Sequence, residues 1–273
     1  MKIYHYTSIQ TLALILKSRS IRFNRLDFVD DLEESAYPSG NKGLNLNLAK
    51  FVYVSCWTKD ADENLALWNM YTNNRGVRIA FDENPFVCYQ KAPNFYSFCD
   101  NLVTIGEDYI MYALNNESKL HEIIYVDNPK EKIKGLIKEE NGFVEMNTKD
   151  LGLYKDNHWQ FQKECRFRIM LYPKNEDLIR RGMTNSGNQA FDQSWGLLLS
   201  LMPALVNGSA VKENELYIKL NEDVLNHIEV MLGPQTTDAD KYIVEKLLAE
   251  FPQHTLTESY FRGECKLNCV KLQ

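Results

Sequence analysis

The sequence lacks long apolar runs and paired-cysteine motifs. Its longest apolar stretch, 195–206, is about half of a membrane span and contains Pro203, so a buried helix is expected there. The six cysteines form no CxxC pair, and Cys265 and Cys269 have no second pair or nearby histidine to complete a zinc set. We therefore expect no membrane attachment, no metal site, and reduced, mostly buried thiols in a cytoplasmic protein.

Excess positive charge, internal repeats and low-complexity tracts are also missing. The formal net charge is −6, which argues against broad attraction to DNA or anionic lipid. A local basic patch of Lys17, Arg19, Arg22 and Arg25 still offers a guide for nucleic acid. The first residues show no basic segment followed by an apolar run, so no signal peptide is expected. The 44% hydrophobic and 25% charged residues indicate an ordinary globular protein.

Hydrophobic periodicity and turn signals predict strands and helices in irregular order. The expected strands are 2–6, 21–23, 51–57, 77–81, 122–126, 164–172, 216–220 and 228–232. The expected helices are 8–17, capped by Thr7 with Gln10, then 62–72 capped by Asp60 or Asp62, 129–140, 148–158 and 237–251. This order predicts an α+β fold. We expect one domain, 1–273, with an insertion at 174–212.

His5 stands where the first strand meets the first helix. A side chain at such a junction opens toward a cleft, and the helix dipole favours an anion nearby. A histidine there suits a hydrogen bond to a ribose hydroxyl. The alternative is a structural histidine bonded to a backbone carbonyl, and for the residue alone the alternative is favoured.

Two further segments carry candidate residues. Trp68 and Tyr71 share one helical face, so Tyr71 either stacks on a flat ring or packs in the core. Glu164 begins a strand whose other face is apolar, and it shares the polar face with Arg166 and Arg168. Its carboxylate either lines a cleft, where it stabilises positive charge on a ribose carbon, or forms a surface salt bridge with one of those arginines.

The order of these segments resembles a widespread, largely bacterial family classed as a domain of unknown function. The matching residues are 4–7 (YHYT), 30–33 (DDLE), 54–57 (VSCW), 68–76 (a WxxYxxxxG unit) and 159–166 (WQFQKECR). The chain departs from the family where DDLE replaces an NDPxE-like segment and where Gln162 replaces a common acidic residue.

That family is in turn similar to ADP-ribosyltransferases of the His-Tyr-Glu type. The resemblance implies a split β-sheet core with surrounding helices and a helical insertion, and it implies NAD as co-substrate. His5 would hold the ribose, Tyr71 would stack on nicotinamide, and Glu164 would orient the ribose and stabilise the transition state. Remaining binding roles would fall to Thr7 in the ribose or nicotinamide pocket, Arg22 at a phosphate, and Ser55 on the strand that lines the cleft.

Three functions stay open on the sequence. The first is transfer of ADP-ribose to an unknown protein or nucleic acid. The second is a binding module without catalysis, in a phage-defence or toxin system. The third is a metal-dependent nuclease built on Asp30, Asp31, Glu33 and Glu164, whose carboxylates suit Mg²⁺. This third function ranks last, because an acidic run in a loop is commonly solvated surface.

Overall fold

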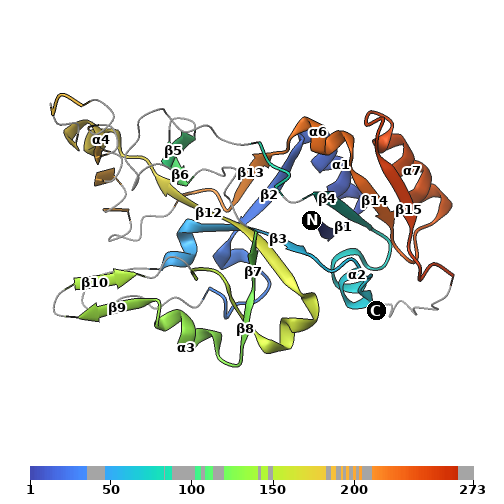
Figure 1. The fold of residues 1–273 in the computed structure, drawn as a ribbon, viewed down its shortest axis with the longest axis horizontal. Coiled ribbons are helices and arrows are strands. Elements are labelled where there is room, and N and C mark those ends of the chain that lie inside the picture. Colours follow the sequence, from blue (N-terminus) through green and yellow to red (C-terminus); the bar gives the residue numbers. More distant parts are fainter. Residues whose placement is uncertain are drawn as a thin grey trace.

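A large mixed sheet with several helices packed on it forms the framework of the chain (Figure 1). The computed structural model describes residues 1–35, 47–82, 84–87, 102–105, 108–112, 120–140, 143–146, 150–182, 186–188 and 211–263, with scattered positions between 192 and 204. This agrees with the predicted mixture of helices and strands. The whole-chain domain assignment and the insertion remain predictions.

The path through the sheet runs β15-β14-β4-β1-β3-β12-β6-β5, and β2, β13 and β7 join it at the side. Its strands are β1 (Lys2–Thr7), β2 (Ser20–Arg25), β3 (Val52–Thr58), β4 (Val77–Asp82), β5 (Leu102–Ile105), β6 (Tyr109–Tyr112), β7 (His121–Glu122), β12 (Glu164–Pro173), β13 (Glu215–Lys219), β14 (Glu229–Leu232) and β15 (Thr255–Glu258). Two small sheets form no strand pair with it: β9 (Ile137–Glu140) pairs with β10 (Phe143–Met146), and β8 (Ile124–Val126) pairs with β11 (Tyr154–Asp156).

The large sheet is weakly joined between β1 and β3. β1 pairs with β4 along its whole length, from Lys2 to Thr7, and β3 pairs with β12 from Val52 to Thr58. The register between β1 and β3, in contrast, contains the single pair Tyr4↔Thr58. Side chains from both strands can therefore reach the space where the strands diverge.

Helices cover both faces of β1. The alternation of the strand sends Ile3 to one face, into a core that includes residues of α1 (Ile9–Ser18) and α7 (Asp238–Leu248). Tyr6 points to the other face, where it packs with Leu67 and Trp68 of α2 (Leu65–Thr72). Further helices with described bounds are α3 (Pro129–Lys134), α4 (Glu176–Gly182) and α6 (Glu222–Asn226), with 3-10 turns η1 (Leu26–Phe28), η3 (Leu48–Phe51) and η4 (Asn157–Gln162).

Two helix caps lie one to four residues after the predicted positions. Ser8, rather than Thr7, caps α1, because its side chain accepts from the backbone N–H of Thr11. Asn64, rather than Asp60 or Asp62, caps α2. Thr7 is thereby left inside β1, where its side chain can line a cavity.

One predicted helix is wrong over its second half, and another over its described part. The helix expected over 129–140 ends at Lys134, because Gly135 caps it and the β-branched Ile137 opens strand β9. The described part of the expected 148–158 helix contains strand β11 followed by η4. Pairing of β11 with β8 outweighs helical propensity in that segment.

Some predictions fall largely outside the described residues. The apolar stretch 195–206 is described at a few positions only. The same holds for the part of the expected insertion, 174–212, that follows α4. Of the six cysteines, Cys56 and Cys165 are described, and both are free thiols. None of the helices in the described ranges combines the length and the apolar character that crossing a bilayer requires.

Gly76 allows the turn between α2 and β4 to lie directly against β1. A Cβ atom at this position would lie 2.2 Å from the carbonyl oxygen of Thr7 and 2.7 Å from Cβ of Thr72. We expect Gly76→Ala to lower the free energy of unfolding by about 1–3 kcal/mol, as overpacking does. Urea denaturation measures this change. Gly135→Ala is the control, because its Cβ would meet nothing closer than 3.3 Å and should leave stability nearly unchanged. Equal stability of the two variants would contradict the close approach.

Candidate functional site

A cavity of about 440 Å³ opens where β1 and β3 diverge. This volume lies within the usual range for small-molecule sites. The walls come from β1, α1, β2, the loop after η1, β3, α2, β11, η4 and β12. All six residues that the sequence singled out for binding or catalysis line it: His5, Thr7, Arg22, Ser55, Tyr71 and Glu164. The structure thus brings together residues that lie up to 159 positions apart in the chain.

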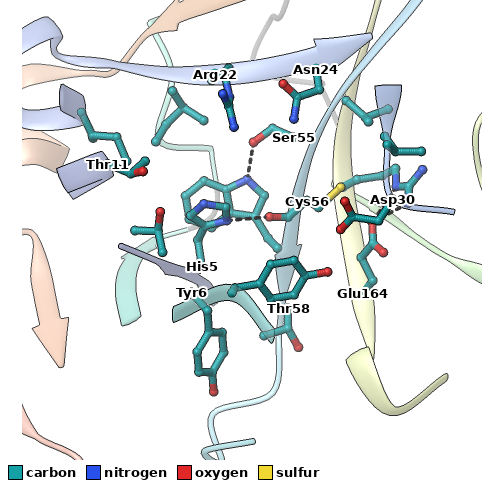
Figure 2. Close-up of a pocket in the computed structure, with 18 of the residues that line it drawn as sticks. His5, Tyr6, Thr11, Arg22, Asn24, Asp30, Ser55, Cys56, Thr58 and Glu164 are labelled. Carbon is teal, nitrogen blue, oxygen red and sulfur yellow. Dashed lines mark hydrogen bonds and ion pairs between the residues drawn. The ribbon is translucent and has the colours of Figure 1, made fainter. Parts of the chain in front are cut away.

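His5 and Ser55 form the wall between β1 and β3 (Figure 2). His5 Nδ1 lies 2.9 Å from the carbonyl oxygen of Cys56. Burial lowers the pKa of His5, so the ring is neutral, Nδ1–H donates to that carbonyl, and Nε2 is an acceptor. Ser55 Oγ accepts a hydrogen bond of 2.9 Å from Nε1 of Trp57. The backbone-bonded histidine expected as the structural alternative is therefore present, but its ring still lines the cavity.

Tyr71 lies at the cavity on α2, and it is not a core residue. It is 40% exposed, whereas its helical neighbour Trp68 is fully buried. Its hydroxyl accepts a 2.9 Å hydrogen bond from Nε2 of Gln162, which fixes the ring beside the cavity. Burial of the hydroxyl raises the pKa of Tyr71, so the phenol remains protonated. Core packing therefore does not describe Tyr71, and its stacking role stays a prediction.

Arg22 and Thr7 contribute to the part of the cavity near α1. Arg22 projects from β2 toward the cavity (Figure 2) and forms an exposed ion pair of 3.0 Å with Glu215. Thr7 is buried at the end of β1. Hydroxyl side chains of α1 and β2 lie nearby and also line the cavity, among them Ser8, Thr11, Ser18 and Ser20. This part of the cavity is therefore polar and carries one guanidinium.

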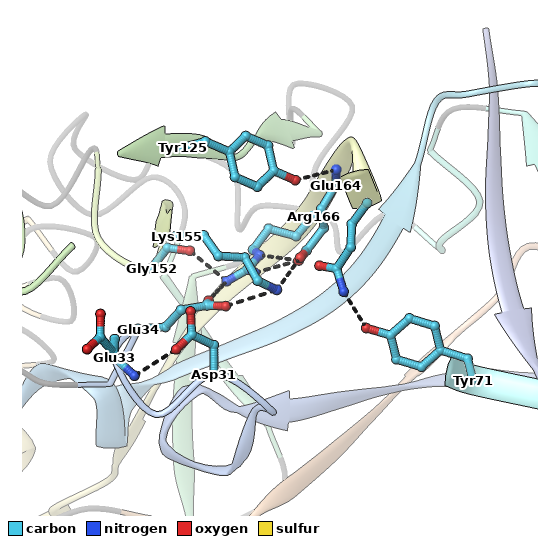
Figure 3. A network of polar contacts seen from close by, with 10 residues as sticks. Asp31, Glu33, Glu34, Tyr71, Tyr125, Gly152, Lys155, Glu164 and Arg166 are labelled. Carbon is cyan, nitrogen blue, oxygen red and sulfur yellow. Dashed lines mark hydrogen bonds and ion pairs between the residues drawn. The ribbon is translucent and has the colours of Figure 1, made fainter. Parts of the chain in front are cut away.

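A buried network of four charged residues forms the opposite wall (Figure 3). Lys155 Nζ lies 2.8 Å from Glu164 Oε2 and 3.1 Å from Glu34 Oε1. Arg166 Nη1 lies 2.7 Å from Glu34 Oε2, and Arg166 Nε lies 2.9 Å from Glu164 Oε1. None of the four residues is more than 7% exposed. Two carboxylates and two cations alternate, so the network is neutral as a whole.

The network corrects the expectation for the polar face of β12. We expected a surface salt bridge between Glu164 and Arg166 or Arg168, or else a cleft position. Glu164 does pair with Arg166, but the pair is buried at the cavity wall. Arg168 instead donates to the carbonyl oxygen of Leu151. The face of β12 opposite the apolar core is covered, because the segment containing Gly152 and Lys155 packs over it.

Glu164 stays anionic at neutral pH. Burial alone would raise the pKa of its carboxyl, but the charges of Arg166 and Lys155 outweigh burial and lower the pKa to about 2. The thiol of neighbouring Cys56 behaves in the opposite way, because burial raises its pKa well above the ordinary value. Glu164 therefore presents a fixed carboxylate to the cavity, beside the unionised thiol of Cys56.

The carboxylates proposed for a nuclease do not gather into a metal site in the described part of the chain. Glu33 pairs with Lys130 at 2.7 Å on the surface. Asp31 Oδ1 accepts from the backbone N–H of Glu33 at 2.9 Å. Glu164 is neutralised by two cations, which would oppose the binding of a further cation.

Sequence reasoning missed three residues of this site. Glu34 directly follows the 30–33 segment and Lys155 lies outside every motif, and only long-range folding brings them to Glu164. Gln162 was noted as a departure from a family pattern, yet it holds Tyr71. No local signal marked Glu34 or Lys155 as buried, because the residues beside them are half-buried or exposed.

Residues 67–167 match the family described as Protein of unknown function (DUF2971). The match includes Tyr71 and Glu164, and it agrees with the expected resemblance to a domain of unknown function. No curated protein and no solved structure matches the chain. The similarity to ADP-ribosyltransferases therefore remains an expectation from the sequence.

Lys155 should be essential for stability. Lys155→Met leaves Glu34 and Glu164 buried with Arg166 as their common partner, and we expect a loss of about 3–5 kcal/mol in the free energy of unfolding. Lys130→Met is the matched control, because it breaks an exposed pair with Glu33 and should change stability by less than about 1 kcal/mol. Urea denaturation compares the two variants. A loss in Lys155→Met no larger than in the control would show that the network does not support the fold.

Glu164 should also make stability depend on pH in the acid range. Its pKa is lowered in the folded state to about 2 from an ordinary value of 4.5, so its contribution is complete above pH 4.5. The contribution is lost as the pH falls from 4.5 toward about 2. Thermal unfolding as a function of pH measures this loss. The part due to Glu164 should disappear in Glu164→Gln and persist in Glu122→Gln, whose side chain is exposed. An identical acid profile for wild type and Glu164→Gln would contradict the assignment.

Proposed function

We propose that the cavity binds NAD and that the protein transfers ADP-ribose to a protein or nucleic-acid acceptor. The observation that carries this proposal is the convergence of His5, Tyr71 and Glu164 on one cavity from β1, α2 and β12. Each residue alone has an ordinary structural explanation. Their common location is what a shared ligand requires.

The residues at the cavity suit the parts of a dinucleotide. The Nε2 acceptor of neutral His5 matches a ribose hydroxyl. The ring of Tyr71, held by Gln162, offers a flat surface for nicotinamide. Arg22 offers a guanidinium to a phosphate, and the hydroxyl side chains of Thr7 and Ser55 also line the cavity. NAD supplies the bond that breaks, between the ribose carbon and nicotinamide.

Glu164 is the group that would act on the transition state. Positive charge develops on the ribose carbon as nicotinamide leaves, and a fixed carboxylate nearby stabilises that charge. The ion pairs with Lys155 and Arg166 hold Glu164 in one orientation and keep it ionised. Preorganisation of this kind lowers the free energy needed to rearrange the site during the reaction.

A second candidate is a binding module that holds the same ligand without turnover. One observation favours it: Lys155 and Arg166 neutralise Glu164, which weakens the field that the carboxylate exerts on a ribose carbon. This candidate predicts that NAD binds and stays intact, and that Glu164→Gln binds as well as the wild type.

The deciding experiment measures NAD binding by calorimetry and release of nicotinamide by the purified protein. We expect binding and slow release in the wild type, and a loss of about 10²–10³-fold in the rate for Glu164→Gln. The control is Glu122→Gln, on the strand that pairs with β12, whose exposed side chain lies outside the cavity lining. Thermal unfolding of each variant checks that the fold is kept.

Three outcomes separate the candidates. Release that Glu164→Gln abolishes supports the transferase, and labelled acceptors can then be sought. Binding without release supports the binding module. Absence of both binding and release in the wild type would overturn the NAD proposal.

A further inference from the structure

Asp30 is a third carboxylate of the cavity, next to the two that belong to the buried network. It lies in the loop after η1, is exposed at the cavity, and contributes to the lining with Glu34 and Glu164. Figure 2 shows Asp30 and Glu164 on the same side of the cavity, close to Cys56. Asp30 also acts electrostatically on the hydroxyl of Tyr71. Its carboxylate therefore lies on the same side of the cavity as Glu164, the residue proposed to act on the nicotinamide ribose.

The loop that carries Asp30 is anchored to the cavity wall. Glu34, four residues further along, is 1% exposed and is bound by Lys155 and Arg166. Asp31 stabilises the turn between them by accepting from the backbone N–H of Glu33. Lys155 and Arg166, which orient Glu164, thus also fix the loop that carries Asp30. The carboxylates of Asp30 and Glu164 therefore keep the same position relative to each other.

Asp30 differs from the other carboxylates of the cavity in its contacts. Glu34 and Glu164 each bind two cations. In the described part of the chain, Asp30 forms no hydrogen bond and no ion pair with any side chain. Its oxygens are therefore open to a hydrogen bond from the attacking group. Of the three carboxylates, Asp30 is thus the one suited to proton transfer.

We infer that Asp30 is the general base that removes the proton from the group attacking the ribose, and this inference rests on the proposed function. The reaction balances as follows. The oxygen or nitrogen of the acceptor bonds to the ribose carbon, and the bond from that carbon to the nicotinamide nitrogen breaks. The bonding electron pair leaves with nicotinamide, and the proton of the attacking group passes to Asp30.

Glu164 and Asp30, two carboxylates in different environments, then have different catalytic roles. Glu164, buried and paired, remains ionised and acts through its charge. Asp30, exposed and unpaired among the described residues, exchanges a proton with the acceptor or with water. Such a separation of roles between neighbouring carboxyls is how enzymes combine electrostatic and acid–base catalysis.

The test compares Asp30→Asn with Glu33→Gln in the full-length protein, with water as the attacking group. Glu33 lies in the same loop but pairs with Lys130 outside the cavity lining, so its variant loses the same charge without touching the site. We expect Asp30→Asn to bind NAD within about twofold of the wild type and to release nicotinamide about 10²–10⁴-fold more slowly. Glu33→Gln should match the wild type in both.

Sodium azide provides a readout that a structural role would not change. Azide is an anionic nucleophile with no proton to lose, so it should restore nicotinamide release by Asp30→Asn and yield an azido-ADP-ribose that mass spectrometry detects. It should restore little activity to Glu164→Gln, which lacks the stabilising charge. Release by Asp30→Asn at the rate of Glu33→Gln, or a slow Asp30→Asn that azide does not accelerate, would overturn the role of Asp30 alone. No release by the wild type would overturn the proposed function together with it.

Discussion

The buried network of Glu34, Lys155, Glu164 and Arg166 is the constraint on which the site depends. Its ion pairs join three segments that lie far apart in the sequence: the loop after η1, β11 and β12. Buried charges are costly unless every one is paired, so the network enforces a single arrangement of those segments. Glu164 is consequently oriented before any ligand arrives, and the loop after η1 is held against the cavity.

The weak join between β1 and β3 provides the rest of the site. Residues on opposite faces of a continuous sheet cannot line one cavity, because side chains alternate between the faces. Here β1 and β3 share a single register pair, and the space between them admits His5 and Ser55 from one side and Cys56 and Glu164 from the other. The cavity is thus a consequence of strand divergence, and the two well-paired halves of the sheet keep it open.

The family match and the cavity overlap only in part. Residues 67–167 contain Tyr71, Lys155 and Glu164, whereas His5 and Arg22 precede the matched segment. The site is assembled from both parts, since β1 lies between β3 and β4 in the sheet. The N-terminal strand and helix therefore also belong to this cavity, although the matched segment does not include them.

The sequence alone determined most strands, the ends of α7 and β12 to within a few residues, and the identity of six cavity residues, because local periodicity and ordered motifs report directly on such features. It failed at 135–140 and in the described part of 148–158, where the pairing of strands β9 and β11 overrode helical propensity. Only the tertiary structure decided that Glu164 is buried and that Glu34 and Lys155 balance its charge. Those contacts join residues as far as 132 positions apart, and no local pattern records which distant charge will neutralise a buried one.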